Sequence, residues 1–220
     1  MSLTRLLQLA SPALPVGAYT YSQGLEWAVE AGMVKDEVTA LQWIGDQLEW
    51  NLGRFEAPLL DRMMAAWKLG AGGTAHELDA QYLASRESAE LRAETLQMGH
   101  SLRRLIDDLG EAVAVPPNST FMCAWSALAA HWLIEPAEAL TAWLWSWAEN
   151  QTMAALKAVP LGQAAGQRIL LEIGERIPAV VERALALEED DYSNSLSNFS
   201  PGFAIACACH ETQYSRLFRS

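Results

Sequence analysis

Two thiols and an imidazole stand close together near the end of the chain, in the order Cys207-x-Cys209-His210. Thiolate sulfur and imidazole nitrogen bind zinc, nickel and copper, so these residues are a candidate metal site. On a helix, however, residues two positions apart point about 200° away from each other, and one ion would meet all three side chains only if the segment unwound. We therefore favour small packing residues in an Ala-Cys-Ala-Cys helix, and keep a helical metal-dependent hydrolase as the alternative.

The other residues that could do chemistry form no recognisable set. The segment Gly162-Gln-Ala-Ala-Gly166 has glycines like those of a phosphate-binding loop, but the spacing is one residue short and the required Lys and Ser/Thr are missing. The remaining histidines, His76, His100 and His131, are dispersed, and no serine or cysteine can be paired with them as a nucleophile. This inventory favours a protein that is not an enzyme.

The composition restricts the class of partner. The 15 Lys and Arg against 27 Asp and Glu give a net charge of −12, while 51% of the residues are hydrophobic. So few, scattered cations build no basic face, which argues against nucleic acid and against anionic lipid as ligands. The 36 Ala and 31 Leu favour helix over strand. We predict an all-α, single-domain bundle of about eight to ten helices with no sheet.

Cysteine usage and apolar runs predict a cytoplasmic protein without a membrane span. Three cysteines are an odd number without disulfide spacing, as in a reducing compartment. The apolar segment at the start meets Pro12 and Pro15 too soon to serve as a signal peptide. A later run over 112–134 is interrupted by Pro116 and Pro117, which leaves about 16 residues where a membrane helix needs about 20.

Capping patterns and hydrophobic periodicity place the helices. Thr20-x-x-Gln23 has the form of a capping box and predicts a helix over about 21–31, preceded mostly by loop. Thr74-x-x-Glu77 is a second such box, and Pro136 suits the first turn of a Trp-rich helix that should be central. The other helices are expected at 36–52, 58–69, 74–110 with one interruption, 119–134 after a Pro-Pro-Asn cap, 136–159, 163–187 and 201–210.

Three regions follow from these elements. Residues 1–187 are predicted to form a helical domain with an N-terminal loop rich in Pro, Gly and Tyr. Residues 188–200 are predicted to be a mobile polar linker. Residues 201–220 are predicted to be a short helix and a docking tail, because aromatic and cationic residues concentrate where a chain end would otherwise fray. The residues alone leave open whether this tail docks on its own domain or on a partner.

Three separated segments carry a resemblance to the UreF family of urease accessory proteins, and the resemblance covers nearly the whole chain. The first is Leu14-Pro-Val-Gly-Ala-Tyr-Thr-Tyr-Ser-Gln-Gly-Leu-Glu26 and the second is Lys157-Ala-Val-Pro-Leu-Gly-Gln163. The third is His210-Glu-Thr-Gln-Tyr-Ser-Arg-Leu-Phe-Arg-Ser220. Their order along the chain is also that of the family.

The resemblance implies an all-helical, usually dimeric protein that joins UreD, called UreH in some organisms, and the GTPase UreG to load nickel into apo-urease. Such a protein is a scaffold that has no cofactor of its own, because its partners handle the nickel and the GTP. The family has also been proposed to modulate hydrolysis of GTP by the GTPase. A direct nickel carrier using Cys207, Cys209 and His210 remains the alternative.

The resemblance also assigns residues to surfaces. Pro15, Gly17, Tyr19 and Arg216 match positions on the surface that receives the GTPase, and Lys157 matches a position expected to influence GTP hydrolysis. In the family the tail becomes ordered against UreD. The tail residues implied in that docking are His210, Glu211, Gln213, Tyr214, Leu217, Phe218 and Arg219.

Overall fold

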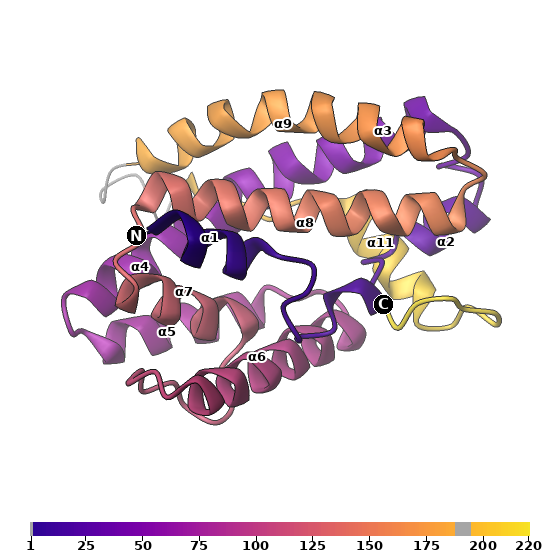
Figure 1. The fold of residues 1–220 in the computed structure, drawn as a ribbon. Helices are drawn as coiled ribbons and strands as arrows, with labels where there is room; N and C mark the ends of the chain where they lie inside the picture. The colour runs from indigo at the N-terminus through magenta and orange to yellow at the C-terminus, as the bar shows by residue number, and fades with distance from the viewer. Residues whose placement is uncertain (1, 188–194) are drawn as a thin grey trace.

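The computed structural model describes residues 2–187 and 195–220, and within them the all-α prediction is confirmed, since no strand occurs (Figure 1). The helices are α1 (Ser2–Ala10), α2 (Leu25–Glu30), α3 (Glu37–Asp46), the π-helix η2 (Gln47–Glu56), α4 (Ala57–Lys68), α5 (Gly72–Ala84), α6 (Ala89–Leu109), α7 (Phe121–His131), α8 (Pro136–Ala158), α9 (Gln163–Leu185) and α11 (Pro201–His210). A short 3-10 turn, η1 (Ala18–Thr20), lies in the N-terminal loop. None of the described helices combines the length and the apolar character that crossing a bilayer requires.

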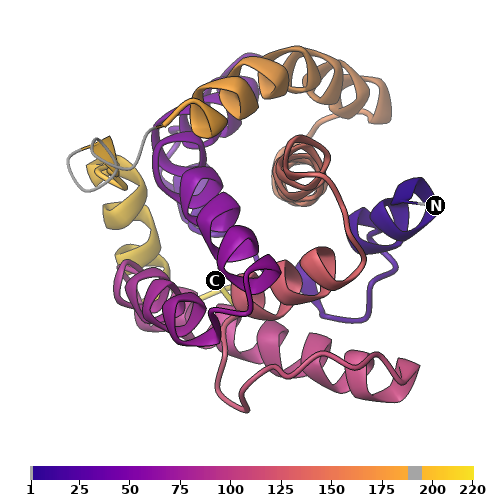
Figure 2. The same cartoon turned by 90° about the vertical axis from the view of Figure 1, so that its left-hand side faces the viewer.

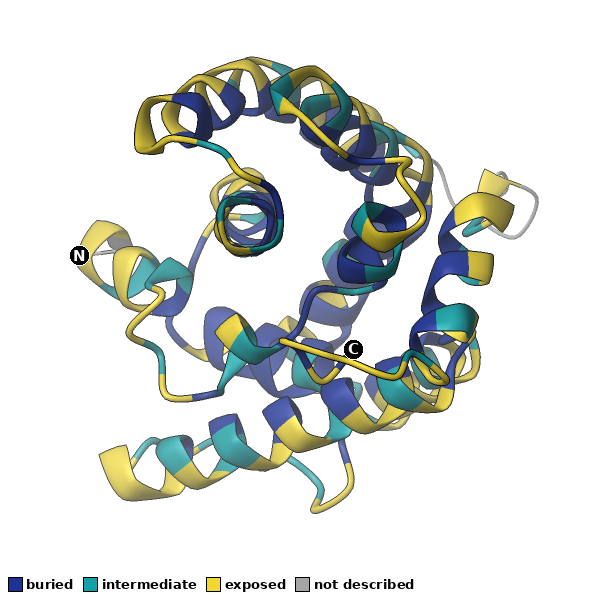
Figure 3. Cartoon of the chain, turned by 90° about the vertical axis from the view of Figure 1, so that its right-hand side faces the viewer, coloured by how far each residue is buried: buried dark blue, intermediate teal, exposed yellow. Residues whose placement is uncertain are grey.

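Helix α8 runs through the middle of the molecule, as its tryptophans predict (Figure 2). It starts at Pro136, whose fixed φ and missing N–H suit the first turn. The ring of Trp143 stacks on Phe121 at a centroid distance of 5.3 Å and meets Trp125 edge-on at 5.5 Å. The helices around α8 turn their buried faces inward, so one continuous core forms about it (Figure 3).

The N-terminal part departs from the expectation. The first residues form α1 rather than loop, because Leu9 is buried and Leu6 packs on the core where α1 meets α8. Thr20 does not cap a helix, since its hydroxyl donates to the carbonyl of Gly17. Helix α2 instead starts after Gln23 and Gly24, which both have positive φ, so the predicted start at residue 21 is wrong.

Two further predicted caps are wrong. Thr74 lies inside α5, which begins at Gly72. The α7 helix is capped by Thr120, whose Oγ1 accepts from the backbone N–H of Cys123 at 3.3 Å, and not by the preceding Pro-Pro-Asn segment. The interruption expected between residues 74 and 110 is confirmed, because Ser88 caps a new helix through the N–H of Leu91.

The helices expected at 36–52 and 58–69 form one continuous run, α3, η2 and α4, whose middle has π geometry. Hydrophobic periodicity did not predict the π geometry, because the spacing of apolar residues in a π-helix is close to that in an α-helix. At the end of η2, Glu56 is buried and accepts hydrogen bonds from Arg86 at 2.8 Å and from the Trp143 indole at 3.3 Å. The π segment therefore supplies a buried carboxylate to the core.

Of the predicted linker, residues 188–194 lie outside the described residues. Farther on, the backbone N–H of Ser197 donates to the carbonyl of Arg54, and the Asn198 side chain donates to the carbonyl of Ser85. This part of the segment therefore has specific hydrogen bonds to the body of the protein.

The crossing of α6 and α7 depends on one glycine. A Cβ added at Gly99 would lie 2.3 Å from the carbonyl oxygen of Ser119 and 2.6 Å from the carbonyl carbon of Thr120. Because backbone atoms cannot rotate away, we expect Gly99→Ala to lower the free energy of unfolding by about 2 kcal/mol and the Tm by roughly 4–8 °C. Gly73→Ala is the control, since a Cβ there meets nothing within 4 Å. Equal melting temperatures for both variants would contradict this account.

Candidate partner-binding surface

The C-terminal tail, residues 211–220, folds back onto the N-terminal loop of its own chain. The backbone N–H of Arg219 donates to the carbonyl of Thr20 at 2.8 Å. The main-chain oxygen of Ser220 accepts from the backbone N–H groups of Ser22 at 2.6 Å and Gln23 at 3.0 Å. Phe218, which precedes Arg219 in the tail, is only 6% exposed. Of the two possibilities that the residues left open, this structure shows docking on the chain's own domain.

The carboxylate of Glu26, in the first turn of α2, anchors the tail. It accepts hydrogen bonds from the backbone N–H groups of Leu217 at 2.6 Å and Phe218 at 3.0 Å. Its Oε2 also lies 3.3 Å from Nε2 of His210 at the end of α11. Because Glu26 is itself buried, these three partners replace the water that its charge would otherwise attract.

A second carboxylate, that of Glu90 at the start of α6, holds the other side of the same junction. Nδ1 of His210 lies 2.7 Å from Glu90, and the Arg216 guanidinium donates to it. The side chain of Glu211 accepts from the backbone N–H of Ala89 at 2.6 Å, at the first turn of α6 where such groups lack a helical partner. His210 is consequently fully buried between α2 and α6.

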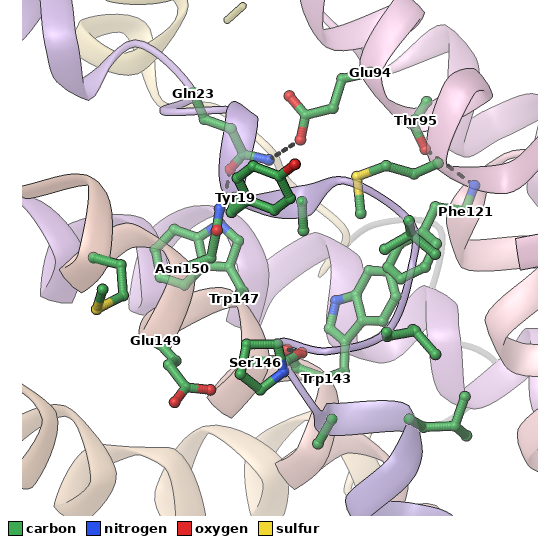
Figure 4. Close-up of a pocket in the computed structure, with 18 of the residues that line it drawn as sticks. Tyr19, Gln23, Glu94, Thr95, Phe121, Trp143, Ser146, Trp147, Glu149 and Asn150 are labelled. Carbon is green, nitrogen blue, oxygen red and sulfur yellow. Dashed lines mark hydrogen bonds between the residues drawn. The ribbon is translucent and has the colours of Figure 1, made fainter. Parts of the chain in front are cut away.

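A hydrogen-bonded chain continues inward from the tail to α8. Glu94 accepts a hydrogen bond from the Ser220 hydroxyl at 2.7 Å. Glu94 also accepts from the Gln23 amide at 2.7 Å, and Gln23 in turn accepts from the Trp147 indole at 2.8 Å (Figure 4). Burial raises the pKa of Glu94 to about 7 despite these donors. These hydrogen-bonded side chains border a mostly apolar cavity of about 230 Å³, and Tyr19 also lines this cavity.

Lys157, at the end of α8, joins the three segments that carry the family resemblance. Its Nζ lies 5.9 Å from the centre of the Tyr19 ring and 5.5 Å from that of Phe218, within range of cation–π attraction. Beside it lies an open hollow of about 480 Å³. The hollow is lined by Tyr19, Thr20, Lys157, Leu217, Phe218 and Arg219.

The residues expected to face the GTPase do not all lie at this hollow. Tyr19 is 65% exposed and Lys157 is exposed beside it, and both line the hollow. Pro15 is exposed and Gly17 half-buried in the preceding loop, but neither lines the hollow. Arg216 does not line it either, because its guanidinium is paired with Glu90.

The residues expected to dock on UreD divide by burial. His210 and Phe218 are buried in this chain, so a partner meets them only if the tail detaches. Tyr214 is fully exposed and Leu217 is 72% exposed. Glu211 and Arg219 are exposed as well, and Gln213 is half-buried.

The structure does not bring the thiols and the imidazole together as a metal site. Cys207 is buried against Gly24, where an added Cβ would lie 3.0 Å from the Cys207 backbone nitrogen, and burial raises the pKa of this thiol well above its usual range. Cys209 is half-buried, and the ring nitrogens of His210 face carboxylates. Over residues 2–187 and 195–220, no group of three His, Cys, Asp or Glu side chains is placed to hold an ion.

Sequence reasoning missed the polar residues that hold the tail, namely Gln23, Glu26, Glu90 and Glu94. Gln23 and Glu26 belong to the quoted loop motif, which was the only available signal. Glu90 and Glu94 are one helical turn apart on α6 and look like an ordinary solvated helix face. Nothing in the sequence indicated that the tail covers them.

Comparison with known proteins gives a consistent set of matches. The family model described as UreF matches residues 34–174. The chain is 57% identical to the urease accessory protein UreF of Dechloromonas aromatica, over 100% of this chain and 98% of that protein. It is also 57% identical to the UreF of Azoarcus sp., over 100% of this chain and 96% of that protein. A bifunctional urease accessory protein UreEF of Bordetella bronchiseptica is 45% identical over 99% of this chain and 52% of that protein.

Proposed function

The chain belongs to the UreF family of urease accessory proteins, and from this premise we propose that it is a non-catalytic scaffold for nickel insertion into apo-urease. It acts in the cytoplasm as a homodimer and holds UreD and the GTPase UreG in one complex. Nickel is the metal delivered to urease and GTP is the nucleotide hydrolysed during delivery, and both are bound by the partners. Contact with the scaffold modulates the rate at which the GTPase hydrolyses GTP.

The observation that carries the proposal is the meeting of three distant motifs at one exposed surface. The ammonium of Lys157, at the end of α8, lies within cation–π range of both the Tyr19 ring of the loop and the Phe218 ring of the tail. These three segments are far apart in the sequence and come together only in the folded chain. Exposed tyrosine and cationic side chains beside a buried aromatic anchor are the composition typical of a protein-binding hot spot.

A second observation favours joint action with other accessory proteins. The Bordetella bronchiseptica relative is named UreEF, and this chain matches about half of it. Fusion of two accessory activities in one polypeptide is a common consequence of their working in one place. A role in the GTPase reaction would require either an arginine at the γ-phosphate or a rearrangement of the GTPase's own catalytic groups.

The test compares two exposed tyrosines on the two proposed surfaces. Tyr19→Ala should lower the affinity for UreG at least about tenfold while UreD still binds, because truncation of a tyrosine anchor removes a hot spot. Tyr214→Ala should lower the affinity for UreD while UreG still binds. Co-purification of the three proteins, followed by titration of each partner, measures both effects. Leu171→Ala, an exposed leucine on α9, is the control that should leave both partners bound.

Two results would contradict the proposal. If both tyrosine variants form the same complex as the unmodified chain, the assignment of these two surfaces to UreG and UreD is wrong. About one tightly held metal ion per purified chain, lost in Cys207→Ser, would instead support the metal-dependent hydrolase or the nickel carrier. Turnover of the GTPase with and without the scaffold then tests the modulation of GTP hydrolysis.

A further inference from the structure

Two cations at the hollow, Lys157 and Arg219, have no carboxylate partner among the residues that the structure describes. Among the described residues, the arginines that form ion pairs with acids include Arg86 with Glu56, Arg103 with Asp107, Arg168 with Glu37, Arg176 with Glu49 and Arg216 with Glu90. Within the described part of the chain, no ion pair involves Lys157 or Arg219.

The Lys157 ammonium and the backbone of Arg219 are held in position at the rim of the hollow. The Lys157 ammonium is located by the rings of Tyr19 and Phe218, and Phe218 is buried and therefore fixed. The backbone of Arg219 is tied to the carbonyl of Thr20, so its side chain starts from a defined point on the same rim. Positions defined in advance reduce the entropy lost when a ligand binds.

From this arrangement we infer that the hollow receives an acidic side chain, Asp or Glu, from the GTPase partner, and holds its carboxylate between Lys157 and Arg219. The inference rests on the proposed function, because it assumes that this surface meets the GTPase. The exposed Leu217 and the ring of Tyr19 flank the carboxylate with apolar area, which excludes water and strengthens the charge pairing.

Charge complementarity supports a carboxylate from a protein rather than a general affinity for anions. The chain carries a net charge of −12, so an acidic partner surface is repelled over most of its approaches. Two unpaired cations in one hollow make a single favourable point of contact, which fixes the orientation of the partner more than it raises the affinity. The main effect of the hollow is therefore to set the orientation of the GTPase in the complex.

The experiment measures the affinity of the GTPase for the full chain bound to UreD. Lys157→Glu and Arg219→Glu should each weaken binding at least about tenfold in about 50 mM salt, and the loss should shrink in about 500 mM salt because rim charges are screened. Arg183→Glu is the control: this arginine is exposed on α9, far along the helix from the hollow, and should leave the affinity within about twofold. Changing surface Asp and Glu residues of the GTPase to Lys, one at a time, should yield one variant that restores binding to Lys157→Glu.

Several outcomes would overturn the inference. If both charge reversals leave the affinity for the GTPase within about twofold of that of the unmodified chain, the two cations do not bind the partner. A loss confined to the nucleotide-loaded GTPase would identify a nucleotide phosphate as the anion instead of a side chain. Increased hydrogen exchange at the Phe218 amide in Lys157→Glu would show that the variant acts by detaching the tail. Failure of the unmodified chain to bind the GTPase at all would instead contradict the proposed function, and the inference with it.

Discussion

Replacement of Glu26 by alanine is expected to detach the C-terminal tail from the body of the protein. The variant loses the acceptor for the Leu217 and Phe218 amides and leaves His210 facing only Glu90. Hydrogen bonds to a charged acceptor contribute about 1.5–3 kcal/mol each, so the docked state should lose about 3 kcal/mol or more relative to the detached state. This corresponds to a change of more than about a hundredfold in the docking equilibrium.

Hydrogen exchange at the Leu217 and Phe218 amides measures this change residue by residue, and tryptic cleavage after Arg216 gives an independent measure. Glu30→Ala is the matched control, since this glutamate lies one turn later on the same helix and is exposed. Unaltered protection of both amides in Glu26→Ala would show that Phe218 burial alone holds the tail. Because the hollow is built partly from the tail, Glu26→Ala should also weaken binding of the GTPase.

The second large effect is a dependence of stability on pH through Glu94. Burial raises the pKa of this carboxyl to about 7, compared with 4.5 in the unfolded chain. Between these two values the folded state binds more protons, so the free energy of unfolding falls as the pH rises from about 4.5 to about 7. The raised pKa corresponds to a loss of on the order of 3 kcal/mol from this one group above that range. Urea denaturation at several pH values measures the slope.

Glu94→Gln should flatten the slope, because glutamine resembles the protonated carboxyl and retains partners in Gln23 and Ser220. At pH 8 the variant should therefore be more stable than the unmodified chain. Glu149→Gln is the control: its pKa is also raised by burial, but its side chain is only half-buried and the effect should be smaller. A slope that is the same in Glu94→Gln and in the unmodified chain would contradict this account.

Local sequence signals predicted this structure well only where no distant or neighbouring backbone constraint acts on the same residues. Pro136 opens α8 as predicted because an N-terminal proline acts through its own φ and its missing N–H. Thr20 does not cap a helix because two residues with positive φ follow it, and α2 begins only after them. Thr74 does not cap a helix because α5 has already begun two residues earlier. Capping motifs are weak preferences that backbone geometry overrides.

The same division explains what was found of the candidate site. The motifs at 14–26, 157–163 and 210–220 were recognised from residue order, and the aromatic and cationic character of the tail predicted that it docks. The partners of the tail were not predictable, because Glu26, Glu90 and Glu94 contact residues more than one hundred positions away. The pairing of such residues depends on loop closure through the whole bundle, to which local propensity gives no guide.

By itself, then, the amino-acid sequence determined the helical class, most of the helices and the family, since these depend on composition, short-range periodicity and residue order. Only the tertiary structure decided that the tail lies on its own domain, that Glu26 and Glu90 enclose His210, and that Lys157 meets two aromatic rings. The reason is physical. A buried carboxylate is stable only where distant donors converge on it, and that convergence exists only in the folded chain.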